Sequence, residues 1–338
     1  MNFDFSDDQQ AIKRTANEFL AARFRPERVR ELAEAKTYDE DAWREMAELG
    51  WSGIFIGEEH GGQELGTVEL IILMEELGYA LAPVPFLSSA AAGLALQYAG
   101  SDEQKERWLP GLASGELTGT VGLARDGEAR LVPDGDSADV IVLAGPDSGV
   151  VVERSAADVE PFESMDATRR FARVRAQGGD PLPGDLLAAL DCISTAVAAE
   201  NVGVAQRAME MAVAYARERK QFDRPIGAYQ AVSHRCAQML LEVEGSRSGV
   251  YYAAWCADSE PESRSLAASS AKAYASDAGW RVCSSSLQVH GGIGFTWEHD
   301  LHFFLKRAKT NALMFGSAAE HRERVAQRSG LEAPAAVA

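Results

Sequence analysis

The chain has 338 residues, 46% of them hydrophobic and 25% charged, so it is long enough to bury a core in more than one domain. A formal net charge of −18 argues against nucleic acid or an anionic membrane surface as the main partner, although a local basic patch can still bind a phosphate-bearing cofactor. Four widely spaced cysteines, an acidic N-terminus and the lack of an apolar run near the roughly 20 residues of a membrane span favour a cytoplasmic protein without disulfides, zinc or membrane insertion.

Residues 1–115 have the pattern of an all-helical domain. Ser-x-x-Gln capping boxes begin at Ser6 and Ser101, and each marks a helix start. Pro83 and Pro85 interrupt the chain between helices. Helices are therefore predicted over residues 7–32, 39–50, 67–81, 90–98 and 102–110. The pair Glu75-Glu76 is interpreted as the solvated face of its helix.

Residues 116–184 differ, because short β-branched runs replace the helical pattern. Strands are predicted over residues 118–121, 140–143, 149–152 and 171–174, with turns rich in Gly, Asp and Pro between them. These runs indicate a small antiparallel sheet or barrel. Residues 177–184 are rich in glycine and proline and are predicted to be a linker.

Residues 185–330 return to a helical pattern. Apolar residues from Leu186 to Tyr215 recur at steps of three, four or seven, which places them on one face of a long helix. Further helices are predicted over residues 229–258, 261–289, 300–306 and 311–328. Long alanine-rich helices with one apolar stripe each are typical of a four-helix bundle.

The predicted fold is thus mainly α with a small β domain. We expect an N-terminal α-helical domain at residues 1–115 and a middle β-sheet or barrel domain with its linker at 116–184. A C-terminal helical bundle should follow at 185–330, and a disordered tail at 331–338.

The segment from Arg217 to Val232, here called the first phrase, joins two predicted helices through a turn. The turn contains charged residues and an aromatic ring. Arg219 lies at the end of the first helix, Phe222 follows its last turn, and Pro225 prevents the helix from continuing. A guanidinium can bind phosphate oxygens in bidentate fashion. No G-x-G-x-x-G follows a predicted strand, so a dinucleotide would need a cradle other than a Rossmann fold.

A second phrase, from Gln288 to Trp297, ends another helix in a run of glycines. Gly291, Gly292 and Gly294 can let backbone N–H groups approach an anion closely. Either phrase alone is as consistent with a solvated arginine or a simple helix end as with a site. The two phrases together favour a cofactor site.

Together the two phrases resemble the cofactor-binding signatures of the acyl-CoA dehydrogenase family, which has the same three-part layout. The resemblance implies FAD as the cofactor and the α,β-desaturation of a CoA thioester as the reaction. In the family, an Arg-x-x-Phe-Gly motif and a later glutamine contact the cofactor, which implies these roles for Arg219, Phe222 and Gln230. Asp223 departs from the motif, because the family usually has glycine there.

The family's Gln-x-x-Gly-Gly element reaches the adenosine diphosphate of the cofactor from a neighbouring subunit. The resemblance carries this cofactor-binding role to Gln288, Gly291 and Gly292. The cofactor site is therefore expected to lie between two subunits.

The catalytic base of the family has no counterpart here. A carboxylate must take the weakly acidic α-proton, and most members carry it in a Tyr-Glu-Gly-Thr stretch. In the corresponding run of this chain Gly316 replaces the expected glutamate. Some relatives place the base on the long helix, where this chain has Ile193, and neither Asp191 nor Glu200 is a convincing substitute. No catalytic residue is therefore predicted.

The middle domain departs from the family as well. It lacks both the Thr-Glu-Pro-x-x-Gly-Ser-Asp stretch and the tryptophan stretch that hold the flavin ring and the thioester. The chain therefore resembles the short, degenerate subunits of heterotetrameric acyl-CoA dehydrogenases in actinobacterial sterol side-chain degradation. The resemblance implies a homologous partner subunit that carries the catalytic glutamate, an acyl-CoA substrate and an electron-transfer flavoprotein as electron acceptor.

Two other functions stay open from the sequence. The chain could be a self-sufficient homotetrameric dehydrogenase with a displaced carboxylate, or a flavin-free structural or acyl-CoA-binding relative. His299 and His302 are interpreted as surface residues, since no third metal ligand is near them. The basic cluster Lys306-Arg307-Lys309 would be either a solvated face or a contact to a nucleotide phosphate.

Overall fold

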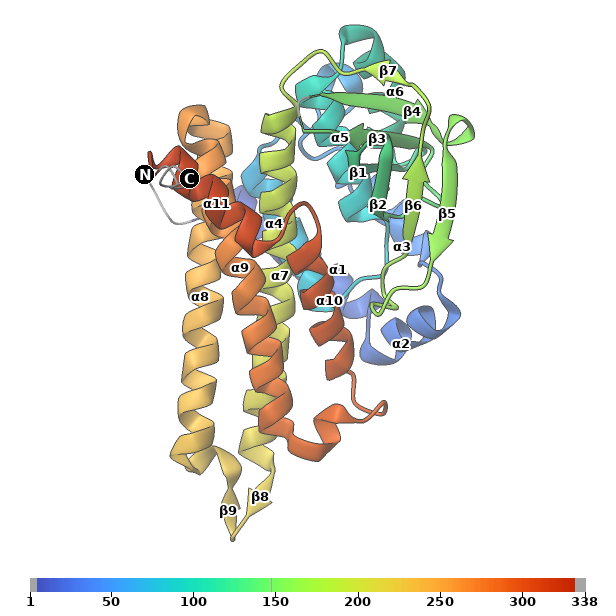
Figure 1. The fold of residues 1–338 in the computed structure, drawn as a ribbon. Coiled ribbons are helices and arrows are strands. Elements are labelled where there is room, and N and C mark those ends of the chain that lie inside the picture. Colours follow the sequence, from blue (N-terminus) through green and yellow to red (C-terminus); the bar gives the residue numbers. More distant parts are fainter. Residues whose placement is uncertain (1–4, 147, 332–338) are drawn as a thin grey trace.

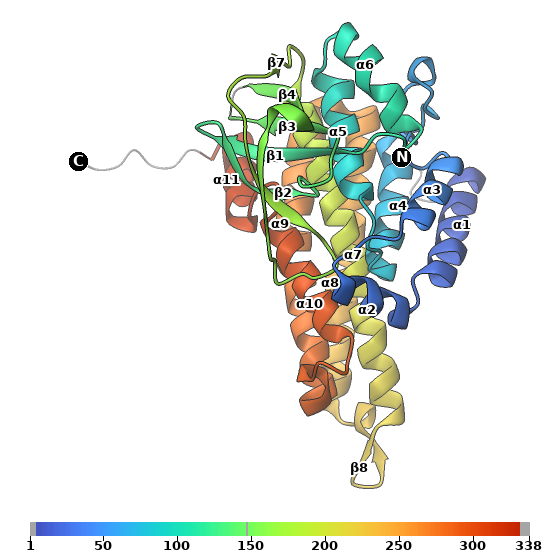
Figure 2. The ribbon, with the colours of Figure 1, turned by 90° about the vertical axis from the view of Figure 1, so that its right-hand side faces the viewer.

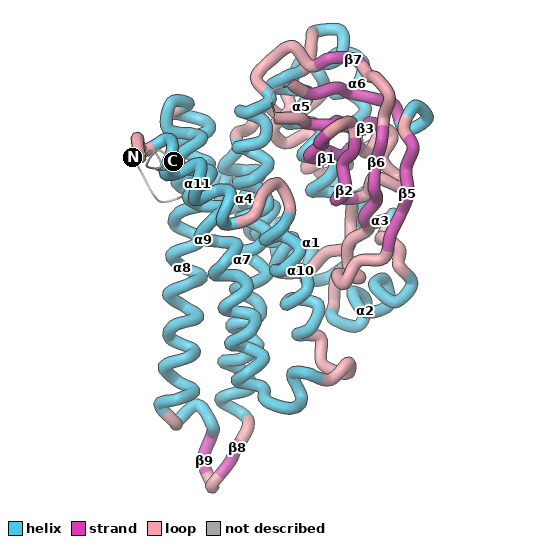
Figure 3. The backbone as a smooth tube through the Cα atoms, in the orientation of Figure 1, coloured by secondary structure: helices cyan, strands magenta, loops and turns pink. Residues whose placement is uncertain are grey.

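A computed structural model describes residues 5–146 and 148–331. Helices from both ends of the chain surround a long central helix, and a sheet lies beside one end of them (Figures 1 and 3). This order of helices, sheet and helices agrees with the predicted fold class. The predicted disordered tail at residues 331–338 lies outside the described residues, except for Leu331.

The first predicted helix is two helices in the structure. Helix α1 (Asp7–Arg23) starts with the predicted capping box, in which Ser6 accepts a hydrogen bond from the backbone of Gln9. Arg25 is extended (φ −63°, ψ 152°), and α2 (Pro26–Ala35) begins at the next residue. The residue before a proline avoids the helical region, so Pro26 ends α1 and opens α2.

The remaining N-terminal helices lie close to their predicted positions. They are α3 (Glu40–Glu48), α4 (Thr67–Ala80), α5 (Phe86–Ala99) and α6 (Asp102–Ala113), whereas the short 3-10 helix η1 (Glu58–His60) was not predicted. Helix α6 does not end at Pro110 as predicted, because the carbonyl of Pro110 still accepts a hydrogen bond from the backbone N–H of Ser114.

Glu75 and Glu76 of α4 are buried, and their interpretation as a solvated face is wrong. Arg247 and Tyr251 hydrogen-bond to Glu75, while Asn17 hydrogen-bonds to Glu76. The helix is surrounded by protein, so these partners replace the water that the two carboxylates would otherwise bind.

A seven-stranded sheet has the order β5-β6-β2-β1-β3-β4-β7. Its strands are β1 (Gly119–Arg125), β2 (Glu128–Pro133), β3 (Val140–Ala144), β4 (Gly149–Glu153), β5 (Asp158–Phe162), β6 (Phe171–Arg175) and β7 (Asp180–Pro181). The sheet is mixed and not antiparallel as predicted, because β3 pairs with β1 in parallel on the side opposite β2. Helix α5 packs against β1, which ties the sheet to the helical core (Figure 2).

The C-terminal part contains α7 (Leu186–Glu218), α8 (Gln230–Ser259), α9 (Pro261–His290), α10 (Leu301–Leu313) and α11 (Ala318–Arg328). The predicted break between residues 306 and 311 is wrong, since α10 continues through both. Instead, Ser317 caps α11 and accepts a hydrogen bond from the backbone of Glu320.

Helix α7 is the centre of the fold and contacts α4, α5, α8, α9 and α10. An 18-residue window of α7 has a mean hydropathy of 1.3, so it is apolar enough for a membrane span, contrary to expectation. However, 89% of that window is buried inside the protein. Its apolar character is therefore that of a core helix.

Helices α4 and α7 cross at two glycines. A Cβ on Gly203 would lie 1.9 Å from the carbonyl oxygen of Glu75, and one on Gly78 would lie 2.0 Å from that of Glu200. No side chain fits between the two backbones at this crossing. The close approach fixes where Glu200 and the following turns of α7 lie.

Candidate functional site

The two phrases singled out in the sequence lie at the same end of the bundle. The rings of Tyr215 in α7 and His290 in α9 stack with centroids 4.7 Å apart, and Ser286 donates a hydrogen bond of 2.6 Å to the carbonyl of Ala208. The hairpin after α7 and the turn after α9 therefore emerge close together. Figures 1 and 2 show the hairpin projecting beyond the helices.

The first phrase forms a hairpin of β8 (Lys220–Gln221) and β9 (Arg224–Pro225), which the sequence did not predict. Phe222 and Asp223 have φ of 52° and 63°, as a two-residue type I′ turn requires. This explains the position of Asp223, because aspartate tolerates the positive φ for which the family uses glycine. Phe222 is 89% exposed at the hairpin tip.

Arg219 and Gln230 flank this hairpin, and both are exposed. Arg219 caps the C-terminus of α7, and Gln230 is the first residue of α8. Arg224 was not singled out from the sequence, although it lies in the same phrase. Its guanidinium lies 4.0 Å from the ring centroid of Tyr229. The hairpin region thus presents two guanidinium groups, an amide and an aromatic ring at the surface.

The second phrase, from Gln288 to Trp297, exposes backbone at its first two glycines. Gln288 is exposed in the last turn of α9, and a 3-10 helix, η4 (Gly291–Phe295), follows. A Cβ added to Gly291 or Gly292 would meet no atom of the chain within 4 Å. Open backbone of this kind fits the close approach of a diphosphate or an adenosine. The residues of the two phrases therefore fit the dinucleotide end of FAD.

The opposite end of the cofactor has no comparable site. Strand β1 passes directly into β2 through Asp126 and Gly127, with φ of 53° and 77°, and Arg125 pairs with Glu128. This two-residue turn leaves no loop after β1 in which the family's ring-binding stretch could lie. The described residues thus fit the nucleotide half of FAD and not the flavin ring.

The base position carries no carboxylate. Ser317 caps α11, and when Gly316-Ser317 is matched to the Gly-Thr of the Tyr-Glu-Gly-Thr stretch, Phe315 stands in place of the glutamate. This register differs from the predicted one, in which Gly316 replaces it. Phe315 is buried with φ 56°, and Gly316 has φ 107°. Neither register provides a group that could take a proton.

The buried side chain of Lys272 hydrogen-bonds to the turn that precedes α11. Nζ of Lys272 donates to the carbonyls of Asn311 (2.9 Å) and Gly316 (3.2 Å) and to Oγ of Ser276 (3.0 Å). Burial lowers the pKa of Lys272 to about 7. Burial and the nearby charge of Lys272 also lower the pKa of His321 to about 4. These hydrogen bonds connect the turn before α11 to α9 and to the end of α10, so the turn has a structural role in this chain.

Glu200 is occupied by ion pairs. Its Oε1 accepts hydrogen bonds from Arg169 (2.6 Å) and Arg307 (2.7 Å). Burial alone would raise the pKa of Glu200, but these guanidinium groups outweigh burial and hold its pKa below the ordinary value. Arg307 is fully buried, so both interpretations of the basic cluster are wrong for this residue. Glu200 is thus unsuited to act as a base.

Asp191 is buried on α7 and accepts a hydrogen bond from Ser265. Burial raises the pKa of this carboxyl above its ordinary value. Ile193 is fully buried. Asp191 is therefore engaged within the core, and the absence of a base on the long helix stays a prediction.

The two histidines contribute no metal site. His302 stacks edge-on against Trp297, with centroids 4.8 Å apart, and His299 packs in the same way on His290. Among the described residues no group of three His, Cys, Asp or Glu side chains could hold a metal ion. Both rings belong to the packing below η4.

The fold and this site define a helix–sheet–helix protein of the flavin-dependent dehydrogenase type. The family descriptions "Acyl-CoA dehydrogenase, N-terminal domain" and "Acyl-CoA dehydrogenase, C-terminal domain" match residues 6–116 and 184–330. The chain belongs to the acyl-CoA dehydrogenase family. Members of this family are FAD-dependent oxidoreductases that act on the CH–CH bond of acyl-CoA.

Similar proteins include other acyl-CoA dehydrogenases, one of them a steroid acyl-CoA dehydrogenase. Acyl-CoA dehydrogenase IpdE2 of Mycolicibacterium smegmatis is 34% identical over 322 residues, which cover 95% of this chain and 98% of the relative. A chain of the ChsE4–ChsE5 complex from Mycobacterium tuberculosis has a TM-score of 0.90 at 26% identity, over 99% of this chain and 100% of that chain. A variant of the Tcur3481–Tcur3483 steroid acyl-CoA dehydrogenase has a TM-score of 0.87 at 27% identity, over 96% and 98%.

Proposed function

We propose that this chain is the non-catalytic subunit of a heterotetrameric acyl-CoA dehydrogenase, in which it completes the FAD site of a base-bearing homologue. One observation carries the proposal. The residues predicted to contact a dinucleotide are exposed at one end of the bundle, whereas Phe315 and Gly316, where the base is expected, have no carboxylate. A chain of this kind can bind half of the cofactor and cannot take the α-proton.

The exposed rings at the dinucleotide-binding end of the bundle support contact with a partner subunit there. Phe295 and Trp297 follow the open glycines and are 71% and 73% exposed, and Phe222 is the most exposed of the three. Large aromatic side chains are enriched where proteins contact each other. We assign this end of the bundle to the subunit whose fold holds the flavin ring.

A second apolar face supports the larger assembly. It lies in a groove between α8 and α9 that is lined by small residues such as Gly245, Gly249 and Ala271 and edged by Tyr252 and Tyr274. Both tyrosines are exposed. Small residues allow helices of another subunit to approach closely, so this face suits the contact between two dimers of an α2β2 tetramer.

The chemistry is divided between the two subunits. When bound, FAD supplies the hydride acceptor for the β-carbon of the thioester. In this chain Arg219 would bind the diphosphate, Phe222 and Gln230 would pack against and hydrogen-bond the cofactor, and the backbone at Gly291-Gly292 would contact the adenosine diphosphate. The partner would supply the carboxylate base.

The relatives suggest the substrate class. The ChsE4–ChsE5 complex and the Tcur3481–Tcur3483 steroid acyl-CoA dehydrogenase both resemble this chain over nearly its whole length. We propose a sterol-derived CoA thioester as substrate, and an electron-transfer flavoprotein as electron acceptor. We also propose that the protein acts in the cytoplasm, in keeping with its four free cysteines.

Two purifications test the assignment. The chain is produced alone and together with a longer homologue encoded beside it, and flavin absorbance and turnover are measured in both. We expect flavin and activity only in the joint preparation. Turnover by the isolated chain would favour a self-sufficient homotetramer, and absence of flavin from both preparations would favour a flavin-free relative.

A further inference from the structure

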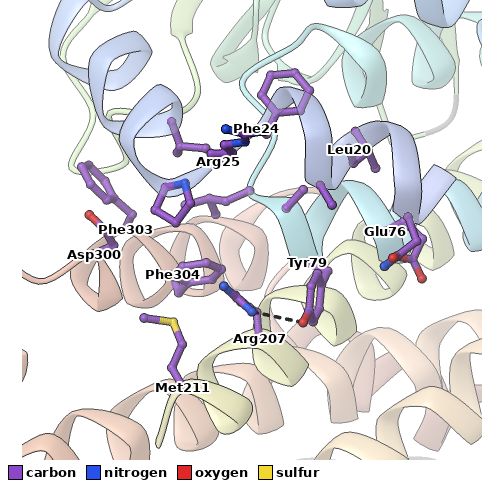
Figure 4. A pocket seen from close by; sticks show the side chains of 16 residues that line it. Leu20, Phe24, Arg25, Glu76, Tyr79, Arg207, Met211, Asp300, Phe303 and Phe304 are labelled. Atoms are coloured by element: carbon purple, nitrogen blue, oxygen red, sulfur yellow. Dashed lines mark hydrogen bonds between the residues drawn. The ribbon is translucent and has the colours of Figure 1, made fainter. Parts of the chain in front are cut away.

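A cavity lies between the N-terminal helices and the bundle (Figure 4). Its volume is about 310 Å³, which is within the range of pockets for small molecules. Helices α1, α2, α4, α7 and α10 all contribute to its walls. None of the residues assigned to the cofactor lines it, so the cavity is separate from the site described above.

The walls are mostly apolar. They include two aromatic rings from the start of α10, aliphatic residues from α1, α2 and α7, and the end of α4. These residues are Leu20, Phe24, Val29, Leu81, Met211, Phe303 and Phe304. Burying an apolar ligand against such walls contributes about 25 cal/mol per Å² of apolar surface removed from water.

Arg207 faces this apolar space, and the exposed Arg25 also lines it. Arg207 projects from α7 between Phe304 and Tyr79 (Figure 4). Its Nη1 donates to Oη of Tyr79 at 3.2 Å, and its Cζ lies 5.3 Å from the centroid of that ring. In the part of the chain that the structure describes, no carboxylate lies within 4 Å of this guanidinium. Since arginine has five N–H donors, most of them remain available to a ligand.

The acidic residues of the cavity already have partners. Glu76 accepts a hydrogen bond from Asn17 and lies 3.7 Å from Nζ of Lys13, and Asp300 pairs with Arg30. Tyr79 donates its hydroxyl proton to Glu210 at 2.5 Å, so its oxygen faces Arg207 as an acceptor. The uncompensated charge in the cavity is therefore positive.

We propose that this cavity binds a small apolar monocarboxylate of medium chain length. The carboxylate would bind the free edge of the Arg207 guanidinium in bidentate fashion, and the chain would lie against Phe24, Phe303 and Phe304. A coenzyme A ester fits less well, because its phosphates would need more cationic groups than this apolar cavity offers. The proposal does not depend on the flavin assignment.

Such a ligand would join two parts of the molecule. It would contact α1 and α2 of the N-terminal part together with α7 and α10 of the bundle. A ligand that binds only the folded protein raises its stability. The site is therefore expected to respond in both calorimetry and thermal unfolding.

Isothermal titration of octanoate into the full-length chain tests the proposal. We expect one octanoate per chain, a raised Tm, and much weaker binding of 1-octanol and of octanoyl-CoA. Arg207→Gln should weaken octanoate binding by roughly tenfold to a hundredfold, because charge-assisted hydrogen bonds are lost. Arg44→Gln is the matched control, since Arg44 is exposed on α3 and pairs only with Asp41.

A second variant blocks the cavity without removing the charge. Ala21 is exposed on α1 at the cavity wall, so Ala21→Trp can fold and place a large ring over the space. It should also abolish octanoate binding while Arg207 remains. Absence of saturable binding by the wild type, equal affinity for 1-octanol, preference for octanoyl-CoA, or unchanged binding in both variants would each overturn the proposal.

Discussion

Nη1 of Arg307 donates to Oε1 of Glu200 across 2.7 Å, and both side chains are almost completely buried. Nε of Arg307 also donates to Asp166 at 2.7 Å, and Arg169 shares the same oxygen of Glu200. Asp166 and Arg169 belong to the chain between β5 and β6, while Glu200 and Arg307 belong to α7 and α10. This network therefore joins the sheet to the bundle through buried charges.

Arg307→Met should destabilise the protein strongly. It leaves Glu200 with one cation and Asp166 with none, and removing one partner of a buried ion pair costs about 3–5 kcal/mol. Urea unfolding followed by circular dichroism measures the loss. Arg28→Met, which removes a half-exposed guanidinium that pairs with the exposed Glu31 and the buried Asp39, should cost less. A loss for Arg307→Met no larger than for Arg28→Met would show that the network does not hold the two layers together.

Lys272 should make stability rise with pH above neutrality. Burial lowers its pKa to about 7, whereas an unfolded lysine titrates near 10.4. Below pH 7 both states carry the proton. Between the two pKa values only the unfolded state binds it, so the free energy of unfolding should rise by up to about 1.4 kcal/mol per pH unit.

Urea unfolding at pH 6, 7.5 and 9 tests this expectation. The wild type should gain stability with pH relative to Lys272→Met. This substitution keeps a long unbranched side chain and removes the charge. Lys36→Met is the control, because Lys36 is exposed and pairs with Glu163 at the surface. Parallel pH profiles for the wild type and Lys272→Met would contradict the expected titration.

Local signals in the sequence predicted much of this fold. Capping boxes at Ser6 and Ser101 marked helix starts, because a cap depends only on residues three positions apart. The apolar period of α7 was equally local. Strand β5 was missed because its residues are mostly exposed, and the parallel pairing of β1 and β3 depends on a crossover that no local pattern records.

The buried charges were beyond the reach of sequence reasoning. Glu200 and Arg307 are 107 positions apart, and a charged residue in a helical pattern predicts a solvated face unless its partner is known. The candidate site stood out because Arg219 and the glycines at 291 and 292 fall within compact phrases. The cofactor roles of these residues and the domain boundaries at residues 115 and 184 stay predictions.

Gly316→Ala should destabilise the turn before α11 and leave flavin binding unchanged. Gly316 has φ 107°, and a Cβ there would lie 2.9 Å from Nε2 of His321. Strain of this kind costs about 1–3 kcal/mol. Thermal unfolding and flavin absorbance of the joint assembly separate the two effects. Loss of flavin with an unchanged Tm would place Gly316 at the cofactor instead.

Arg219→Ala should release FAD from the assembly with the partner subunit. The side chain is exposed and its backbone caps α7, so its removal leaves the fold intact while a contact to the diphosphate is lost. Charged hydrogen bonds contribute about 1.5–3 kcal/mol, which corresponds to weaker binding by roughly one to two orders of magnitude. Flavin per assembly after gel filtration is the measurement, and Arg217→Ala, two residues earlier at the end of α7, is the control. Full retention of flavin by Arg219→Ala would count against the cofactor assignment.

Gly292→Val separates cofactor binding from folding most sharply. A Cβ at Gly292 would meet no atom of this chain within 4 Å, and its φ lies outside the left-handed region. The isolated chain should therefore keep its Tm. In the assembly, however, the added methyl groups would stand between the backbone N–H groups and the cofactor, and flavin content should fall. Gly61→Val provides the comparison. A Cβ at Gly61 is equally unobstructed, but Gly61 has a φ of 80°, which a valine does not readily adopt. This variant should therefore lower Tm and leave flavin content unchanged. An assembly of Gly292→Val that retains its full flavin content would show that the cofactor does not approach this backbone.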